Sequence, residues 1–182
     1  MKYHSEITLK NGKKCIIRSA TQEDAATMVD VFNVTHAQTD FLLSTPEECD
    51  LTADDEANYL QEKLDSDNTV ELLAEVDGVL AGSAGVDAVG NKFKLKHRAE
   101  FGISVLKEYW GLGIGRALTN AAVECAKKAG YEQLELNVVS ENEAALSLYK
   151  SVGFVEYGRN PKGFRSPLTG WQELVSMRLE LN

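Results

Sequence analysis

Three glycines at alternate positions, Gly111, Gly113 and Gly115, stand directly before a run of residues with helical spacing. Glycine has no Cβ, so its backbone can take a positive φ and can lie close to a ligand. A turn of this kind at a helix start directs several N–H groups outward, beside the positive end of the helix dipole. The spacing predicts a cradle for a pyrophosphate, made by Gly111, Leu112, Gly113, Ile114, Gly115 and Arg116.

Two other phosphate-binding loops fail on spacing. A dinucleotide fingerprint, G-x-G-x-x-G, would need glycine at Arg116 or at Leu118, counting from Gly111 or from Gly113. A Walker loop needs Gly-Lys-Ser/Thr, which does not occur in the chain. A glycine-rich turn without any ligand is the simple alternative.

The flanking sequence extends the pattern on both sides of the cradle. In order come a strand-like run 99–106, the cradle, a helix 116–129, a strand 133–138, and then Asn142, Tyr149 and Gly153-Phe154. Together these resemble the acetyl-CoA-binding half of the GNAT N-acetyltransferase superfamily, from about Glu100 to Phe154. That family usually has Gln/Arg-x-x-Gly-x-Gly/Ala in the loop, and here Trp110 stands where Gln or Arg is usual.

The resemblance implies an α/β fold with a mixed, mostly antiparallel central sheet flanked by helices. Its two middle strands splay apart, and the pantetheine arm of acetyl-CoA enters the gap between them. The chain is expected to form one such domain over 1–182. The element order agrees: a hairpin at Asn11-Gly12, helices from about 22 and 53, strands 68–76, 79–88 and 97–106, then helix, strand, helix and strands 154–159 and 172–181.

The resemblance also assigns roles in cofactor binding. Backbone groups of Ile103, Ser104 and Val105 would pair with the pantetheine amides as an added strand does, and the Val105 N–H is the candidate for the acetyl oxygen. Asn142 would contact the pantetheine or phosphate region. The alternatives are that Ile103 and Val105 are merely apolar strand residues and that Asn142 is a helix N-cap, a position that asparagine fills well.

Acyl transfer from a thioester to an amine needs a neutral amine, a polarised carbonyl and a proton for the departing thiolate. The resemblance makes Tyr149 the proton donor, and a phenol is neutral at pH 7. A core aromatic is the alternative role of this residue. Lys127, Lys128 and Lys150 are further candidates for the phosphates, with a solvated helix face as the alternative for each.

Glu100 is the candidate base, acting on the amine through a water molecule. It lies five residues before Val105, and an odd offset along a strand puts two side chains on opposite faces unless a bulge intervenes. A solvent-facing strand glutamate is the alternative. The other residues that could serve as base are Asp87, Glu173 and His97.

By resemblance, the acceptor pocket is built from the acidic stretch 36–51 and a loop, 158–170, that carries basic residues. A small-molecule amine or a peptide end would suit such a pocket. The formal net charge of −9 disfavours a nucleic acid partner. A homodimer through the final strands is possible.

No apolar run approaches the ~20 residues of a membrane span, and the N-terminus lacks the apolar stretch of a signal peptide, so we expect a cytoplasmic protein without a membrane partner. Three histidines lack metal-ligand spacing, and three cysteines form no C-x-x-C pair, so no metal is expected. The sequence predicts an acetyl-CoA-dependent N-acetyltransferase that acts on a primary amine by direct attack in a ternary complex. The alternatives are a non-catalytic acyl-CoA-binding regulatory module and a transferase for protein N-termini or lysines.

Overall fold

A single twisted sheet organises the computed structural model, which describes residues 1–48 and 50–181. The strands are β1 (His4–Thr8), β2 (Lys14–Ser19), β3 (Val70–Val76), β4 (Val79–Ala88), β5 (Arg98–Val105), β6 (Gln133–Val139), β7 (Val155–Ser166) and β8 (Gly170–Glu180). Their order across the sheet is β1-β2-β3-β4-β5-β6-β8-β7. Only the β5–β6 pair is parallel within this part of the chain, so the expected mixed, mostly antiparallel sheet is confirmed.

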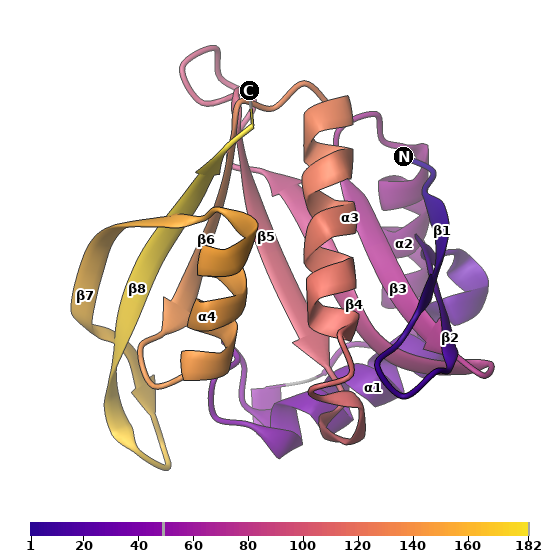
Figure 1. Cartoon of the computed structure of the whole chain (residues 1–182), viewed down its shortest axis with the longest axis horizontal. Coiled ribbons are helices and arrows are strands. Elements are labelled where there is room, and N and C mark those ends of the chain that lie inside the picture. Colours follow the sequence, from indigo (N-terminus) through magenta and orange to yellow (C-terminus); the bar gives the residue numbers. More distant parts are fainter. Residues whose placement is uncertain (49, 182) are drawn as a thin grey trace.

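Helices cover both faces of the sheet, as Figure 1 shows. They are α1 (Ala25–Gln38), α2 (Ala53–Asp65), α3 (Ile114–Lys128) and α4 (Glu143–Val152), with short 3-10 turns at Gln22–Asp24, Pro46–Glu48 and Lys107–Tyr109. The larger core lies between the sheet and α3 and α4, where Leu118 and Met177 are fully buried. A smaller core under α1 and α2 includes Leu60 and Leu73. Neighbouring strand residues serve opposite cores because successive side chains alternate between faces.

Local signals account for most element boundaries. The turn at Asn11-Gly12 joins β1 and β2 into the predicted hairpin. The Thr52 side chain accepts a hydrogen bond from the Asp55 N–H at 3.1 Å, which caps α2 as expected. The helix expected from Gln22 begins with a 3-10 turn before α1 takes over at Ala25.

The middle of the sheet opens where β5 leaves β6. These strands share only the pairs from Arg98–Gln133 to Glu100–Glu135, although β6 continues beside β8 over its full length. Arg98 forms an ion pair with Glu135 that fastens the closed end. Figure 1 shows the two strands diverging from there toward the end of the sheet where α3 begins. The expected splay of the middle strands is thereby confirmed.

The expectation of a loop over 158–170 is wrong for most of that segment. β7 runs on to Ser166 beside β8, with irregular register around Gly158 and between Asn160 and Phe164. Asn160-Pro161-Lys162-Gly163 has the composition of a turn, but the register shift absorbs it without ending the strand. The turn that joins β7 to β8 lies between Ser166 and Gly170.

A close approach of β4 to β5 shapes the open end of the gap, which gives a first prediction. A Cβ on Gly82 would lie 2.5 Å from the Ser104 carbonyl oxygen and 2.9 Å from the Val105 Cα, and neither main-chain atom can move alone. We expect Gly82→Ala to lower the free energy of unfolding by ~1–3 kcal/mol, measured by urea denaturation. Gly102→Ala is the matched control, because a Cβ there meets open space. Equal stability of the two variants would contradict the close approach.

Candidate active site

The edge of β5 that faces the gap presents main-chain hydrogen-bonding groups. The Leu106 N–H donates to the Ala81 carbonyl on the β4 side at 2.9 Å. Because bonding residues alternate along an antiparallel strand, Ile103 and Val105 direct their N–H and C=O groups away from β4, toward the gap. Ser104 does the opposite: its main chain faces β4, and its side chain points to the α1 side of the sheet. Of these three expected pantetheine contacts, two therefore offer main-chain groups to the gap.

Trp110 lies at the mouth of this gap. Its indole N–H donates to the Val105 carbonyl at 2.7 Å, and its ring is about half exposed, 48%. The N–H and C=O groups of one residue in an antiparallel strand point to the same side, so the Val105 N–H also faces the gap. The position where Gln or Arg was expected thus carries a side chain that occupies one of the β5 carbonyls.

The glycine loop leads directly into α3. Gly111 and Gly113 have φ of +76° and +104°, values that residues with a Cβ rarely adopt. The first helical bond runs from the Ala117 N–H to the Gly113 carbonyl at 3.1 Å. The N–H groups of residues 114–116 therefore have no intrahelical acceptor and point out of the helix start. This is the geometry of an anion-binding helix N-terminus.

Two contacts fix the loop in place. The Leu112 carbonyl accepts a hydrogen bond from the Lys10 N–H at 3.1 Å, so the β1–β2 turn holds the loop from one side. A Cβ on Gly115 would lie 3.3 Å from the Leu148 Cδ2, so this glycine allows α3 to pack closely on α4. The glycines of the loop thus serve different purposes, two in its backbone turn and one in helix packing.

Arg116 is the cationic residue placed at the cradle. Its side chain is exposed, and its Nη2 donates to the Ser151 Oγ of α4 at 2.7 Å. Lys127 and Lys128 lie at the other end of α3, ~20 Å away by the rise of an α-helix. These two lysines are therefore not brought to the same phosphate group as Arg116.

Tyr149 of α4 is buried against β5, at the first residue of that strand that no longer pairs with β6. Its ring packs edge-on to Phe101, with 6.1 Å between centroids, and 7% of the residue is exposed. Burial raises the pKa of Tyr149, so the phenol stays protonated at neutral pH. The rest of the described chain gives its hydroxyl no hydrogen-bond partner. A neutral phenol is therefore held near the point where β5 and β6 part.

Asn142 begins the helix that carries Tyr149. Its Oδ1 accepts a hydrogen bond from the Ala145 N–H at 3.2 Å, so the side chain caps α4. This bond fixes where the helix starts and thereby the depth at which Tyr149 lies. The capping role uses the amide oxygen, and any contact of Asn142 to a cofactor would use its Nδ2 group.

Glu100 is exposed and lies on the face of β5 opposite Phe101 and Tyr149. Its cross-strand neighbours on that face are Asp87 of β4 and Glu135 of β6. The absence of a bulge between β4 and β5 keeps Glu100 and Val105 on opposite faces, as the odd offset predicts.

The other carboxylates considered as base are engaged in ion pairs. Asp87 pairs with the buried Lys63 of α2, and Glu173 pairs with Arg159 at 2.7 Å. His97 lies at the closed end of the β5–β6 pair, where its main-chain carbonyl accepts hydrogen bonds from the N–H groups of Glu132 and Gln133. Glu100 is the one of these candidates that stands at the point where the strands part.

Comparison with known proteins decides the family. Residues 35–154 match the model described as the Acetyltransferase (GNAT) family. This chain belongs to the GNAT acetyltransferase family. It is accordingly an acyltransferase.

Similar proteins cover almost the whole GNAT chain. This chain is 25% identical to the L-amino acid N-acyltransferase MnaT of Escherichia coli K12, and the alignment covers 91% of this chain and 94% of that protein. The crystal structure of a GNAT-family acetyltransferase from Streptococcus pneumoniae has a TM-score of 0.87 and 30% identity, covering 91% of this chain and 99% of that one. YncA of Salmonella typhimurium, solved with acetyl-CoA, shares the fold with a TM-score of 0.80 and 22% identity, covering 91% and 93%.

Three further observations concern metal ions, membrane-spanning helices and cysteines. No group of three or more His, Cys, Asp or Glu in residues 1–48 and 50–181 could hold a metal ion. Among the helices that the structure describes, none is long and apolar enough to cross a membrane. Of the cysteines, Cys15 and Cys125 are buried and free, and Cys49 lies outside the described residues.

The two segments expected to form the acceptor pocket of this GNAT chain do meet. Asp40, just after α1, accepts hydrogen bonds from the Ser166 and Thr169 hydroxyls at 2.7 and 2.6 Å. The Gln172 side chain of β8 donates to the Asp40 carbonyl at 2.9 Å. The end of the β7–β8 hairpin is therefore tied to the segment between α1 and α2.

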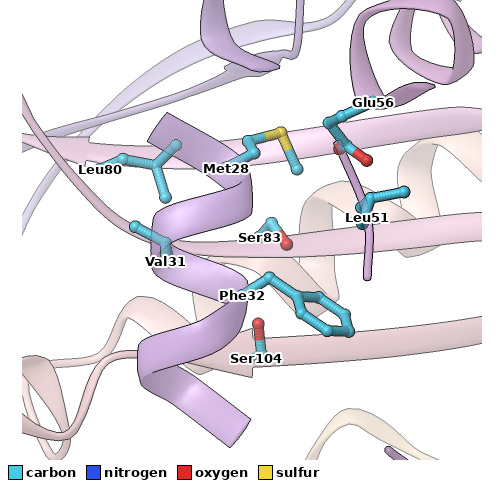
Figure 2. Close-up of a pocket in the computed structure, with 8 residues that line it drawn as sticks. All are labelled: Met28, Val31, Phe32, Leu51, Glu56, Leu80, Ser83 and Ser104. Atoms are coloured by element: carbon cyan, nitrogen blue, oxygen red, sulfur yellow. The ribbon is translucent and has the colours of Figure 1, made fainter. Parts of the chain in front are cut away.

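A small cavity lies on the α1 and α2 side of the sheet, opposite the glycine loop. Figure 2 shows the eight side chains around it, Met28, Val31, Phe32, Leu51, Glu56, Leu80, Ser83 and Ser104. Its free space is about 30 Å³, room for one or two water-sized groups. The cavity adjoins β5 at Ser104, beside the residues whose main chain faces the gap.

Two buried carboxylates near this cavity were missed by sequence reasoning. Glu56 and Glu71 are 7% and 8% exposed. Burial raises the pKa of Glu71 to about 7, and Lys63 offsets only part of this effect. A Cβ on Gly85 would lie 2.8 Å from the Glu71 Oε2, so this glycine makes room for the carboxyl group. An acid between apolar neighbours in the strand 70–76 was the available signal for Glu71.

The raised pKa of Glu71 predicts a pH-dependent contribution to stability. The folded protein binds the Glu71 proton up to about pH 7, whereas the ordinary pKa is 4.5, so stability from this group falls as pH rises between these values. We expect Glu71→Gln to gain up to ~3 kcal/mol in unfolding free energy relative to the parent between pH 5 and pH 8. Urea denaturation at both pH values measures this difference. A parallel pH dependence of the two proteins would place the pKa of Glu71 at its ordinary value.

Proposed function

We propose that this protein transfers an acetyl group from acetyl-CoA to a primary amine by direct attack within a ternary complex. The observation that carries the proposal is the alignment of three features on one side of β5. The main-chain groups of Ile103 and Val105 that face the gap lead from the open helix start at residues 113–116 toward the buried Tyr149. An extended, anionic thioester cofactor fits such a path.

Cofactor binding follows from the hydrogen-bonding groups on this path. The N–H groups of residues 114–116 bind the pyrophosphate, and Arg116 adds charge. The Val105 N–H, next to the cradle, pairs with the pantetheine amides as a neighbouring strand would, and Trp110, which occupies the Val105 carbonyl, holds this residue in position. The thioester lies farther from the pyrophosphate than the pantetheine arm does. We therefore assign the acetyl oxygen to the Ile103 N–H, two residues nearer to Phe101 and Tyr149, in place of the Val105 N–H expected from the sequence.

The chemistry then needs only groups that the chain supplies. The Ile103 N–H stabilises negative charge on the thioester oxygen as the amine nitrogen bonds to the carbonyl carbon. When the C–S bond breaks, Tyr149 donates its phenolic proton to the thiolate. Glu100, on the opposite face at the start of the gap, accepts the proton of the amine through water.

The acceptor is proposed to be a primary amine on a small cationic or zwitterionic molecule. The net charge of −9 and the acidic stretch between α1 and α2 favour a cationic ligand. The similarity to a protein named L-amino acid N-acyltransferase supports an acceptor of amino-acid size. A screen of primary amines for release of free CoA tests the activity directly, and an absence of release with every amine would favour a non-catalytic acyl-CoA-binding module.

The cradle gives a prediction for cofactor affinity. Gly113→Ala places a Cβ at a φ of +104°, which adds ~1–3 kcal/mol of backbone strain and favours another shape of the loop. We expect acetyl-CoA to bind roughly tenfold or more weakly, because the N–H groups would no longer be held in the binding geometry. Isothermal titration of the folded variant measures the affinity. Gly130→Ala is the matched control, because Gly130 follows the same helix with a φ of +82° and open space for a Cβ. If both variants bind acetyl-CoA as the parent does, the cradle lies elsewhere.

The proton donor gives a prediction for turnover. Tyr149→Phe should lower kcat by roughly 10- to 1000-fold with little change in acetyl-CoA affinity, because the hydroxyl acts only as the thiolate leaves. Steady-state kinetics on an amine found in the screen measure this effect. Tyr131→Phe removes the hydroxyl of another buried tyrosine, beyond the far end of α3, and should leave kcat unchanged. Unchanged turnover in Tyr149→Phe would make Tyr149 a packing residue.

A further inference from the structure

The cavity between α1 and α2 contains a buried carboxylate that the described chain leaves without a partner. Glu56 of α2 is 7% exposed, and Figure 2 shows its carboxyl group directed into the space between Met28 and Leu51. No described residue forms a hydrogen bond or an ion pair with this carboxyl group. Burial raises the pKa of Glu56. A carboxyl group buried in this way is unfavourable unless something positive or proton-donating is supplied to it.

The charges around Glu56 do not supply that partner. Glu71 lies close enough that repulsion from Glu56 and Asp87 contributes to its raised pKa. Lys63, the buried cation of this helix, forms its ion pair with Asp87. The Tyr59 phenol has its pKa raised by burial and by the same carboxylates, so it stays neutral. The described surroundings of the cavity therefore leave no cation for Glu56, and a bound ammonium group would supply one.

The place of the cavity distinguishes it from the reaction centre. Its sheet side is formed by Ser83 of β4 and Ser104 of β5, whereas the thioester gap lies on the other side of β5. Neighbouring strands are ~5 Å apart, so a group in the cavity is displaced from the gap by at least that distance. A nitrogen held here is not the attacking nitrogen, but it can belong to the same small molecule, some four or five bonds away.

The walls of the cavity favour a compact ammonium group. The free space of about 30 Å³ holds one or two water-sized groups, and the side chains of Met28, Val31 and Phe32 give the cavity apolar walls. An ion pair inside such a low-dielectric site is stronger than at the surface. Two serine hydroxyls, Ser83 and Ser104, can accept the remaining ammonium hydrogens.

We propose that Glu56 binds a second cationic group of the acceptor, so that the preferred substrate is a compact diamine or a basic amino acid. This inference rests on the proposed acetyl transfer to a primary amine. It assigns the α1–α2 cavity as the specificity site and Glu56 as its specificity-determining residue. A pocket meant for an apolar side chain would not need a carboxylate in its wall.

A matched pair of acceptors tests the proposal. 1,4-Diaminobutane and n-pentylamine have similar length, but only the diamine carries a second ammonium group. We expect the parent protein to use the diamine with the higher kcat/KM. We expect Glu56→Gln to lower kcat/KM for the diamine by roughly 10- to 100-fold, the range for a hydrogen bond to a charged group, and to leave pentylamine nearly unaffected. Glu62→Gln is the control, because Glu62 is exposed on the same helix.

Calorimetric titration of 1,4-diaminobutane into the protein saturated with CoA gives a readout without turnover. The parent should bind the diamine and release protons at pH 7, because a bound cation lowers the pKa of Glu71 from about 7. Glu56→Gln should bind it at least tenfold more weakly. It should also remain folded, since it loses a buried charge that has no partner, and thermal unfolding verifies this.

The outcomes separate the two proposals. Acetylation of both amines with equal kcat/KM, or an equal loss for both in Glu56→Gln, would overturn the specificity site and leave the acetyl transfer intact. Binding of the diamine that depends on Glu56, without acetylation of either amine, would support the cation site and overturn the proposed function. A diamine-specific loss in Glu56→Gln supports both.

Discussion

The separation of β5 from β6 is the feature on which the rest of the site depends. Three residue pairs join the strands, and the Arg98–Glu135 ion pair fastens that end. Beyond Glu100 the two strands follow different partners, β4 for β5 and β8 for β6. A sheet interior normally satisfies every main-chain N–H and C=O group. In the open segment of β5, Ile103 and the N–H of Val105 instead have no strand partner, and a chain-like ligand with its own amides would satisfy them.

Because β5 borders the gap along one edge, it organises chemistry on both faces of the sheet. Phe101 projects toward α4 and contacts Tyr149, while Glu100 and Ser104 project toward α1 and α2. The alternation of a strand therefore places the proposed proton donor and the acceptor cavity on opposite sides of one backbone. A donor and an acceptor substrate could approach the same carbonyl without sharing a binding surface.

Sequence reasoning identified what short-range patterns encode. The glycine spacing before α3, the Thr52 cap and the hairpin at Asn11-Gly12 depend on a few neighbouring residues, and the resemblance supplied the splayed sheet. The direction of the Ser104 main chain could not be predicted, because it depends on which residue of β4 lies opposite.

The other features that the sequence did not predict depend on long-range packing. The continuation of β7 through Pro161 depends on how β8 accommodates extra residues, which no local turn pattern reports. Glu56 resembles the exposed acids around it in α2, and only the position of α1 across from it makes it buried. Trp110 was recognised as a departure from the family loop, but its bond to Val105 required the three-dimensional path of the loop.

The bond between Lys10 and Leu112 has a consequence for how the protein is assembled. It joins residues roughly one hundred positions apart, and contacts between distant positions form late because closing a long loop has an entropic cost. The residues around the α1–α2 cavity, by contrast, all precede the glycine loop in the chain. On a ribosome, the half that would select the acceptor can therefore begin to fold before the cofactor loop has been synthesised. We expect the cradle to be among the last parts of the molecule to reach its final shape.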